Sequence, residues 1–250
     1  MKIAVISDIH GNLEALDAVL NDIKINQCDK IICLGDIALA GPEPSKTIDK
    51  IKSLIKECDF SVIQGNTDER LSKFSQEFLD AVTVANVTMA NAYLADLEEL
   101  SDEDKIFLGE LEKHKELNIA DIKILLVHGS PRRNDENIFP DLAVELVEEM
   151  IKGVDANLIF CGHTHIPCGY QTNTNQTVVN VGSVGRPFSN DPKSCYVVLD
   201  IDEDTSTYSL EHKFVPYDFE TAAKKMLNRK FEGAEKLAKM LECATSRYPD

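Results

Sequence analysis

Side chains that could bind metal ions follow short apolar runs at five places in the chain: Asp8, His10, Asp36, Asn66, His128, His163 and His165. Their donors are carboxylate and amide oxygens and imidazole nitrogens, with no thiolate among them. Such a set suits manganese, iron or zinc better than calcium. Seven donors exceed what one of these ions holds in an open catalytic site. We therefore predict two divalent or mixed-valence ions, roughly 3.5–4 Å apart, that share Asp36.

Each residue alone has an ordinary alternative. Asp8 is typical of a turn or a helix cap, and His128 could be a histidine of the core. The pair His163 and His165 is more specific, because side chains two positions apart in an extended segment point the same way. Four of the six histidines fall at such positions, and together the seven residues favour a metal site. The other two histidines are interpreted as solvated surface groups: His114 and His212.

Alternating apolar and amphipathic segments must position these side chains. Strands are predicted over residues 2–6, 30–34, 60–64, 122–127 and 158–161, each ending just before a candidate metal ligand. Helices are predicted over residues 12–25, 45–56 and 141–152. This alternation indicates parallel strands joined by right-handed crossovers, whose carboxyl ends face one crevice. We therefore expect the seven side chains to meet there.

The rest of the chain shows other patterns. Residues 69–118 lack strand patterning and are predicted to be helical. Ser101, followed three residues later by Asp104, resembles the start of one helix. Residues 168–172, 177–181, 194–201 and 207–213 are rich in β-formers, with a turn at 173–176, so antiparallel pairing is expected. Helices are predicted over 218–228 and 230–244. No linker divides the chain, so residues 1–250 are interpreted as a single domain, in which the 69–118 segment could form a cap.

Composition argues against several functions. The 250 residues carry a net charge of −17, which disfavours binding to nucleic acid through its backbone charge. An acidic protein that acts on phosphates needs bound metal or a basic pocket, and the sequence has no large basic cluster. No apolar stretch is long enough for a membrane span or a signal peptide, so we expect a cytoplasmic protein without a membrane partner. The seven cysteines lack a CxxC pair and are expected to be buried free thiols.

These blocks resemble the five-block signature of the calcineurin-like metallophosphoesterases. The matching segments are Asp8-Ile9-His10, Gly35-Asp36, Gly65-Asn66-Thr67-Asp68, His128-Gly129 and Gly162-His163-Thr164-His165. Residues 180–187 are also similar to a segment of small bacterial and archaeal members. The resemblance implies an α/β fold, a four-layer α/β/β/α sandwich with mixed sheets. It further implies a first metal held by Asp8, His10, Asp36 and His165, and a second held by Asp36, Asn66, His128 and His163.

The resemblance also implies a metal-dependent phosphoester hydrolase. A hydroxide held between the ions would be the nucleophile, and Asp36, Asn66 and His128 would act through it. Many members carry a histidine in the third block that assists the leaving group, but this chain has Thr67 there, which cannot be a general acid near neutral pH. We therefore predict a phosphodiesterase. The alternative enzyme is a phosphomonoesterase or a Ser/Thr protein phosphatase. The alternative that is not an enzyme is a non-catalytic metal-binding regulatory module.

The substrate is expected to be a phosphoester, whose oxygens could be bound by Arg132, Arg133 and Arg186 as fork-shaped donors. The alternative for each arginine is a solvated loop position. The sequence leaves open whether the chain forms a homo-oligomer with further copies of itself.

Overall fold

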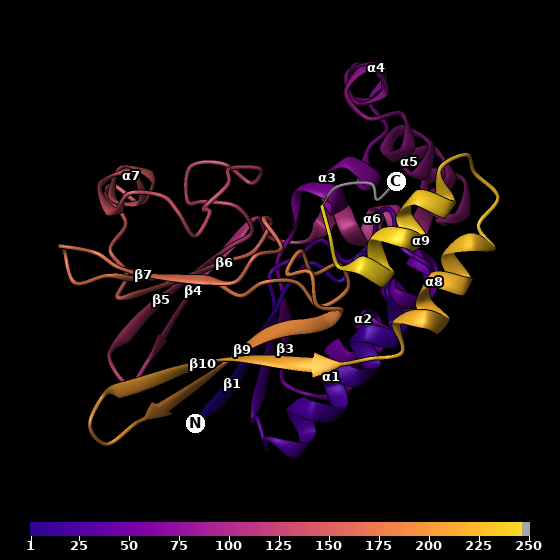
Figure 1. Cartoon of the computed structure of the whole chain (residues 1–250). Helices are drawn as coiled ribbons and strands as arrows, with labels where there is room; N and C mark the ends of the chain where they lie inside the picture. The colour runs from indigo at the N-terminus through magenta and orange to yellow at the C-terminus, as the bar shows by residue number, and fades with distance from the viewer. Residues whose placement is uncertain (247–250) are drawn as a thin grey trace.

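The computed structural model of the protein describes residues 1–246. Within them, two five-stranded mixed sheets pack face to face, and nine helices lie outside them. Helices α1 (Leu13–Ile25), α2 (Pro44–Glu57), α8 (Phe219–Leu227) and α9 (Ala234–Cys243) gather beside the first sheet, whereas α7 (Val144–Met150) lies on the outer side of the second (Figure 1). The predicted four-layer sandwich is confirmed.

The first sheet has the strand order β10-β9-β1-β2-β3. Strands β1 (Lys2–Ile6), β2 (Lys30–Cys33) and β3 (Phe60–Val62) run parallel, as their helical crossovers require. Strands β9 (Lys193–Asp202) and β10 (Thr207–Pro216) form an antiparallel hairpin, and β9 pairs antiparallel with β1.

The second sheet has the order β4-β5-β6-β8-β7. Strands β5 (Ile122–Val127), β6 (Leu158–Cys161) and β8 (Thr177–Asn180) are parallel, with β4 (His114–Ile119) and β7 (Cys168–Gln171) antiparallel at the two edges. The predicted turn at residues 173–176 joins β7 to β8. The five ligand-bearing strands therefore belong to two sheets, not to one parallel sheet as the alternation suggested.

Alternation along the strands divides the apolar side chains among three cores. Ile3 and Val5 of β1 face the second sheet, whereas Ala4 and Ile6 pack against the helices. On β5, Ile124 and Leu126 face the first sheet, whereas Leu125 and Val127 pack toward α7. Because successive strand side chains point to opposite faces, each near-continuous apolar run serves two cores at once.

Four further helices lie between β3 and β4: α3 (Asn66–Ser72), α4 (Gln76–Ala85), α5 (Val87–Glu99) and α6 (Asp102–Glu110). The predicted helix start at Ser101 is confirmed, because its Oγ accepts from Asp104 N–H at 3.1 Å and the carboxylate of Asp104 accepts from Ser101 N–H at 3.2 Å. The prediction of helix throughout 69–118 is wrong at its end, where β4 begins. That strand pairs with β5 in a short hairpin, but it alternates exposed polar side chains with half-buried ones, so its sequence carries little strand signal.

Other predictions need correction. Helix α7 is shorter than the predicted 141–152, because residues before Val144 and after Met150 are not helical. His212 is half-buried on β10, where its Nε2 lies 2.8 Å from the carbonyl oxygen of Asn180, so it is not a solvated surface group; His114 is exposed as predicted. All seven cysteines are free thiols, but only three are buried: Cys58 is exposed, and Cys28, Cys168 and Cys243 are partly buried. Within residues 1–246, every helix is too short or too polar to cross a bilayer.

Candidate metal centre

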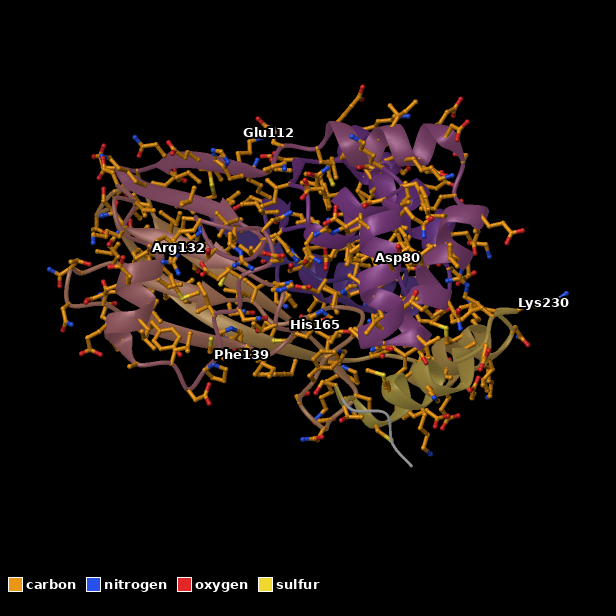
Figure 2. All side chains as sticks on the ribbon, turned by 90° about the horizontal axis from the view of Figure 1, so that it is seen from above. Asp80, Glu112, Arg132, Phe139, His165 and Lys230 are labelled. Atoms are coloured by element: carbon orange, nitrogen blue, oxygen red, sulfur yellow. The ribbon has the colours of Figure 1, made fainter. Side chains whose placement is uncertain are left out.

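The seven predicted metal-binding side chains meet where the carboxyl ends of strands from both sheets converge. Asp8 and His10 follow β1, Asp36 follows β2, and Asn66 begins α3 after β3. The remaining three follow β5 and β6: His128, His163 and His165. Figure 2 shows His165 near the middle of the molecule, between the strands on one side and the helices on the other. The sequence expectation that these side chains meet is therefore correct.

The first cluster consists of Asp8, His10 and His165, all buried. Oδ1 of Asp8 lies 3.2 Å from Nε2 of His165 and 3.8 Å from Nε2 of His10. The two Nε2 atoms are 3.1 Å apart. Three potential ligand atoms thus face one small volume.

The second cluster consists of Asp36, Asn66, His128 and His163. Nε2 of His128 lies 3.3 Å from Oδ2 of Asp36 and 3.0 Å from Oδ1 of Asn66. One ligand atom each of Asp36, His128 and His163 lies within 4.8 Å of the other two. The cluster offers two oxygens and two nitrogens.

Asp36 lies between the clusters. Its Oδ2 is 3.6 Å from Nε2 of His10 and 3.3 Å from Nε2 of His128. Its Oδ1 accepts a hydrogen bond from Thr67 N–H at 2.9 Å, which orients the carboxylate. A carboxylate in this place can serve both clusters at once.

The residues present fit a pair of cations. Nδ1 of His10 donates to the carbonyl of Leu39 at 2.9 Å, and Nδ1 of His165 donates to the carbonyl of Arg186 at 2.6 Å. In neutral imidazoles with this tautomer, the Nε2 lone pairs of the two rings face each other across 3.1 Å. Oδ1 of Asp8, fully buried, has no hydrogen-bond partner. A cation satisfies all three atoms, and the Nδ1–carbonyl bonds are the usual support of metal-binding histidines.

The electrostatics of the site favour cations as well. Burial opposes ionisation of Asp36, but His128 and His10 hold its pKa at about 2. Burial also opposes ionisation of Asp8, yet attraction to the same histidines and His165 keeps its pKa well below the ordinary value. Burial alone would lower the pKa of His128, and Asp36 raises it to about 9. Both carboxylates are thus ionised at neutral pH, and His128 holds a proton that a bound metal would displace.

Five of the seven residues have a left-handed backbone: Asp8, His10, Asp36, His163 and His165, with φ between 48° and 67°. This conformation costs a residue with a β-carbon roughly 1–2 kcal/mol, and such strain persists only where surrounding structure fixes it. Hydrogen bonds between neighbouring loops do so here: His10 N–H donates to the carbonyl of Asp36 at 2.9 Å, and Gly185 N–H to the carbonyl of Asp8 at 3.0 Å. The backbone therefore sets the ligand directions before any ion binds.

Asp68 braces the second cluster, a role that the sequence interpretation missed. Its buried carboxylate accepts hydrogen bonds from the N–H groups of Asp36 at 2.8 Å, Ile37 at 2.9 Å and Gly65 at 2.9 Å. Burial, followed by repulsion from Asp36, raises its pKa to about 6. A β-carbon at Gly65 would lie 2.0 Å from Oδ1 of Asp36, so only glycine fits there. The block Gly65-Asn66-Thr67-Asp68 thus positions Asp36 and also supplies Asn66 to the second cluster.

A buried ion pair braces the first cluster from farther away. The carbonyl of Leu39, which holds His10, precedes Ala40, whose N–H donates to Oδ2 of Asp96 on α5 at 2.9 Å. Arg229, after α8, pairs with the other oxygen of Asp96 and donates to the carbonyl of Gly41 at 2.9 Å. Asp96 is fully buried. No local sequence pattern links Asp96 to Arg229, because the two residues are 133 positions apart.

The predicted phosphate-binding arginines lie in different places. Arg132 and Arg133 are on the loop after β5, beside His128, and pair with Glu136 at 2.6 Å and Asp135 at 3.0 Å. Figure 2 shows Arg132 on the side of the second sheet. Arg186 contributes its carbonyl to the centre, but its guanidinium nitrogens are 3.9 and 4.0 Å from the sulfurs of Met89 and Met240.

Comparison with known proteins identifies relatives over most of the chain. The sequence matches the profile of the calcineurin-like phosphoesterase superfamily domain over residues 1–204. The uncharacterised protein MJ0912 of Methanocaldococcus jannaschii is 34% identical over 244 residues, covering 91% of this chain and 93% of that protein.

Solved structures share the architecture. The hypothetical protein PH1004 from Pyrococcus horikoshii OT3 superimposes with a TM-score of 0.84 at 24% identity, covering 96% of this chain and 97% of that one. A metallophosphoesterase from Sphaerobacter thermophilus superimposes with a TM-score of 0.76 at 25% identity, covering 98% of this chain and 100% of that one. Both comparisons extend over nearly the whole length.

Proposed function

The chain belongs to the calcineurin-like phosphoesterase superfamily and is a phosphoric ester hydrolase, and from this premise we propose that it is a phosphodiesterase with two metal ions. The observation that carries the proposal is the position of Asp36, whose Oδ2 lies 3.6 Å from Nε2 of His10 and 3.3 Å from Nε2 of His128. One carboxylate between two clusters of oxygen and imidazole donors is the arrangement that a two-metal hydrolase needs.

The first ion would be held by Asp8, His10, Asp36 and His165, and the second by Asp36, Asn66, His128 and His163. Mixed oxygen and imidazole donors favour manganese, iron or zinc. When bound, two such ions lower the pKa of water toward neutrality and neutralise the oxygens of a phosphoryl group.

The protein's own contribution is to fix these donors. The carbonyls of Leu39, Leu34 and Arg186 each hold the Nδ1 of one histidine: His10, His128 and His165. Thr67 N–H and the loop braced by Asp68 hold Asp36. Because the ligand rotamers are set by backbone contacts, little reorganisation is needed when substrate binds.

Thr67 supports a diester substrate. Its hydroxyl donates to the carbonyl of Ala38 at 3.0 Å, so its proton is already engaged, and its pKa is far too high for acid catalysis near pH 7. Ester groups that leave without protonation are then favoured. Charge points the same way, since Arg132 and Arg133 are paired with carboxylates of their own loop. A diester carries one negative charge at neutral pH, whereas a monoester carries close to two, so the diester makes the smaller demand on positive charge.

We further propose that residues 1–250 act as a single metallophosphoesterase domain, with the helices of the 69–118 segment beside the site as a partial cap. A cap is supported by two observations: Arg70 of α3 lines the same cavity as Asn66 and His128, and its guanidinium carbon lies 4.7 Å from the ring centroid of Phe78 of α4.

The diesterase assignment is tested with a manganese-loaded sample on p-nitrophenyl phosphate and bis(p-nitrophenyl) phosphate, which share one leaving group. We expect a higher kcat/KM on the diester. The variant Asp36→Asn should lose activity on both, which excludes a contaminating phosphatase. A higher kcat/KM on the monoester would overturn the assignment.

A further inference from the structure

A groove of about 1040 Å³ leads away from the metal centre along the second sheet. Two metal-binding residues, Asn66 and His128, line one end, and Lys123 and Asp155 line the other. The volume lies at the upper end of the range of ligand pockets, about 300–1,000 Å³. A methyl or nitrophenyl ester would leave most of it empty.

The groove exists because the outer face of this sheet is only partly covered. Helix α7 packs on the apolar side chains of β5 and β6, but the outward side chains of the edge strand β4 are exposed: His114, Glu116 and Asn118. Cross-strand pairing places them beside Val127, Leu125 and Lys123 of β5. The result is an apolar strip with hydrogen-bonding groups along one edge.

The length of the groove follows from strand geometry. From Lys123 to His128, β5 and the next residue advance five steps, or about 17 Å at roughly 3.4 Å per residue. Leu125 and Val127, 7% and 3% exposed, form part of the lining along this path. A ligand that fills the groove is therefore elongated, with an apolar face and a polar edge.

Arg70 lies at the metal end of the groove. It is four residues after Asn66 on α3, so the two side chains share one face of the helix. Its guanidinium lies over the ring of Phe78 and, within residues 1–246, forms no ion pair. By contrast, Lys113 at the same end is paired with Glu69 at 2.7 Å. Arg70 is thus held in place by a ring and has its donors available for an anion.

The charge of the groove differs from that of the whole protein. Five basic and four acidic side chains line it, whereas the chain has 26 basic and 43 acidic residues. An anionic ester is therefore less strongly repelled here than over the rest of the surface.

We propose that this groove binds one alcohol arm of an elongated phosphodiester, an arm of nucleoside type with a flat ring and hydroxyl groups, while Arg70 contacts the phosphate at the metal end. The inference rests on the proposed diesterase function and names its substrate class. The apolar strip of β5 contacts the ring, and the polar edge of β4, ending at Asn118, contacts the hydroxyl and ring heteroatoms. The lining contains no Phe, Tyr or Trp, so the ring packs on aliphatic side chains.

The test compares two esters with the same leaving group and the same single charge: the p-nitrophenyl ester of thymidine 5′-monophosphate and methyl p-nitrophenyl phosphate. With the manganese-loaded protein we expect a KM about tenfold lower for the thymidine ester, equivalent to roughly 1.4 kcal/mol of binding. Asn118→Trp should fill the far part of the groove and remove that difference, with the methyl ester changed less than about twofold. Arg70→Gln should raise KM for both esters together, because both share the phosphate.

The matched control is Ser209→Trp, an exposed position on β10, the edge strand of the other sheet. It should leave both KM values unchanged, and circular dichroism should show both tryptophan variants folded. Equal KM values for the two esters in the unaltered protein, or equal behaviour of Asn118→Trp and Ser209→Trp, would overturn the proposed groove.

Calorimetry separates failure of the groove from failure of the diesterase assignment. If neither ester is hydrolysed, the diesterase function has failed, and the groove is then decided by the binding of thymidine 5′-monophosphate and methyl phosphate to the metal-loaded protein. Tighter binding of the nucleotide that Asn118→Trp weakens about tenfold supports the groove, whereas equal affinities contradict it.

Discussion

Replacing Arg229 by methionine should strongly destabilise the protein, although the residue lies outside the metal centre. Arg229 is the ion-pair partner of Asp96, whose side chain has no exposed surface. Removing one member of a buried pair leaves an uncompensated charge and typically costs about 3–5 kcal/mol. For a chain of this length, each kcal/mol lowers Tm by about 2–4 °C, so the variant should melt about 6–20 °C lower at pH 8.

The loss should depend on pH in a defined direction. Burial raises the pKa of Asp96 to about 6 from the ordinary 3.8, even though Arg229 opposes the rise. A carboxyl group whose pKa is raised in the folded state adds to the free energy of unfolding when it is protonated. This contribution, roughly 3 kcal/mol, is fully present below pH 3.8 and is lost as the pH rises through 6. At pH 5 Asp96 is mostly protonated, so removing Arg229 should cost only about 1–2 kcal/mol, as for a neutral hydrogen bond.

Urea unfolding at pH 5 and pH 8, with a chelator present so that metal binding does not contribute, measures both values. Asp96→Asn keeps an oxygen for the N–H of Ala40 and removes the charge, so adding it to Arg229→Met should recover part of the loss at pH 8. The methionine variant should also bind manganese about 10–100-fold more weakly, because the carbonyl that holds His10 is no longer fixed. A cost below 1 kcal/mol at pH 8, or a larger cost at pH 5 than at pH 8, would refute the reasoning.

The proposed metal centre yields three further predictions. Asp36→Asn should lower kcat/KM about 10³-fold, the effect of roughly 4 kcal/mol of lost charge stabilisation, and should reduce the metal content measured by mass spectrometry; retention of two ions per chain would contradict the bridging position. Asp68→Asn should weaken metal binding about 10–100-fold in a calorimetric titration, since the amide that replaces the carboxylate cannot accept all three backbone N–H groups equally well. The control is Glu77→Gln on the exposed part of α4, which should leave metal binding unchanged. Removal of metal by a chelator should abolish hydrolysis but leave the far-ultraviolet circular dichroism spectrum unchanged; loss of helical signal would show that the ions hold the fold together.

The meeting of the proposed metal-binding side chains could be predicted because each follows an apolar run that is also a strand. Asp36 and His128 illustrate this, since they stand three residues and one residue past strands that need no tertiary information to be recognised. Which sheet each strand joins was not predictable in the same way. Pairing of β1 with β9 connects residues almost 200 positions apart, and no local pattern encodes it.

The residues that support the ligands escaped prediction for a similar reason. Asp96 looks like a surface charge on an amphipathic helix and Arg229 like a surface charge between two helices, and only the packing of α5 against the region after α8 buries them. The strand β4 was missed because its outward side chains are polar and exposed. Arg70 was overlooked in favour of Arg132 and Arg133, because the sequence shows adjacent arginines but not the carboxylates with which they pair.

Left-handed conformations at five of the proposed metal-binding positions bear on how the protein folds. Such conformations are rare in an unfolded chain, so the two clusters do not exist until the sheets and their loops have formed. Together they hold on the order of 5–10 kcal/mol of strain, comparable to the whole stability of a typical domain. Metal ions therefore cannot serve as the nucleus of folding. Synthesis in a metal-poor cell should yield folded chains ready for loading, so that metal supply would control activity without controlling the amount of protein.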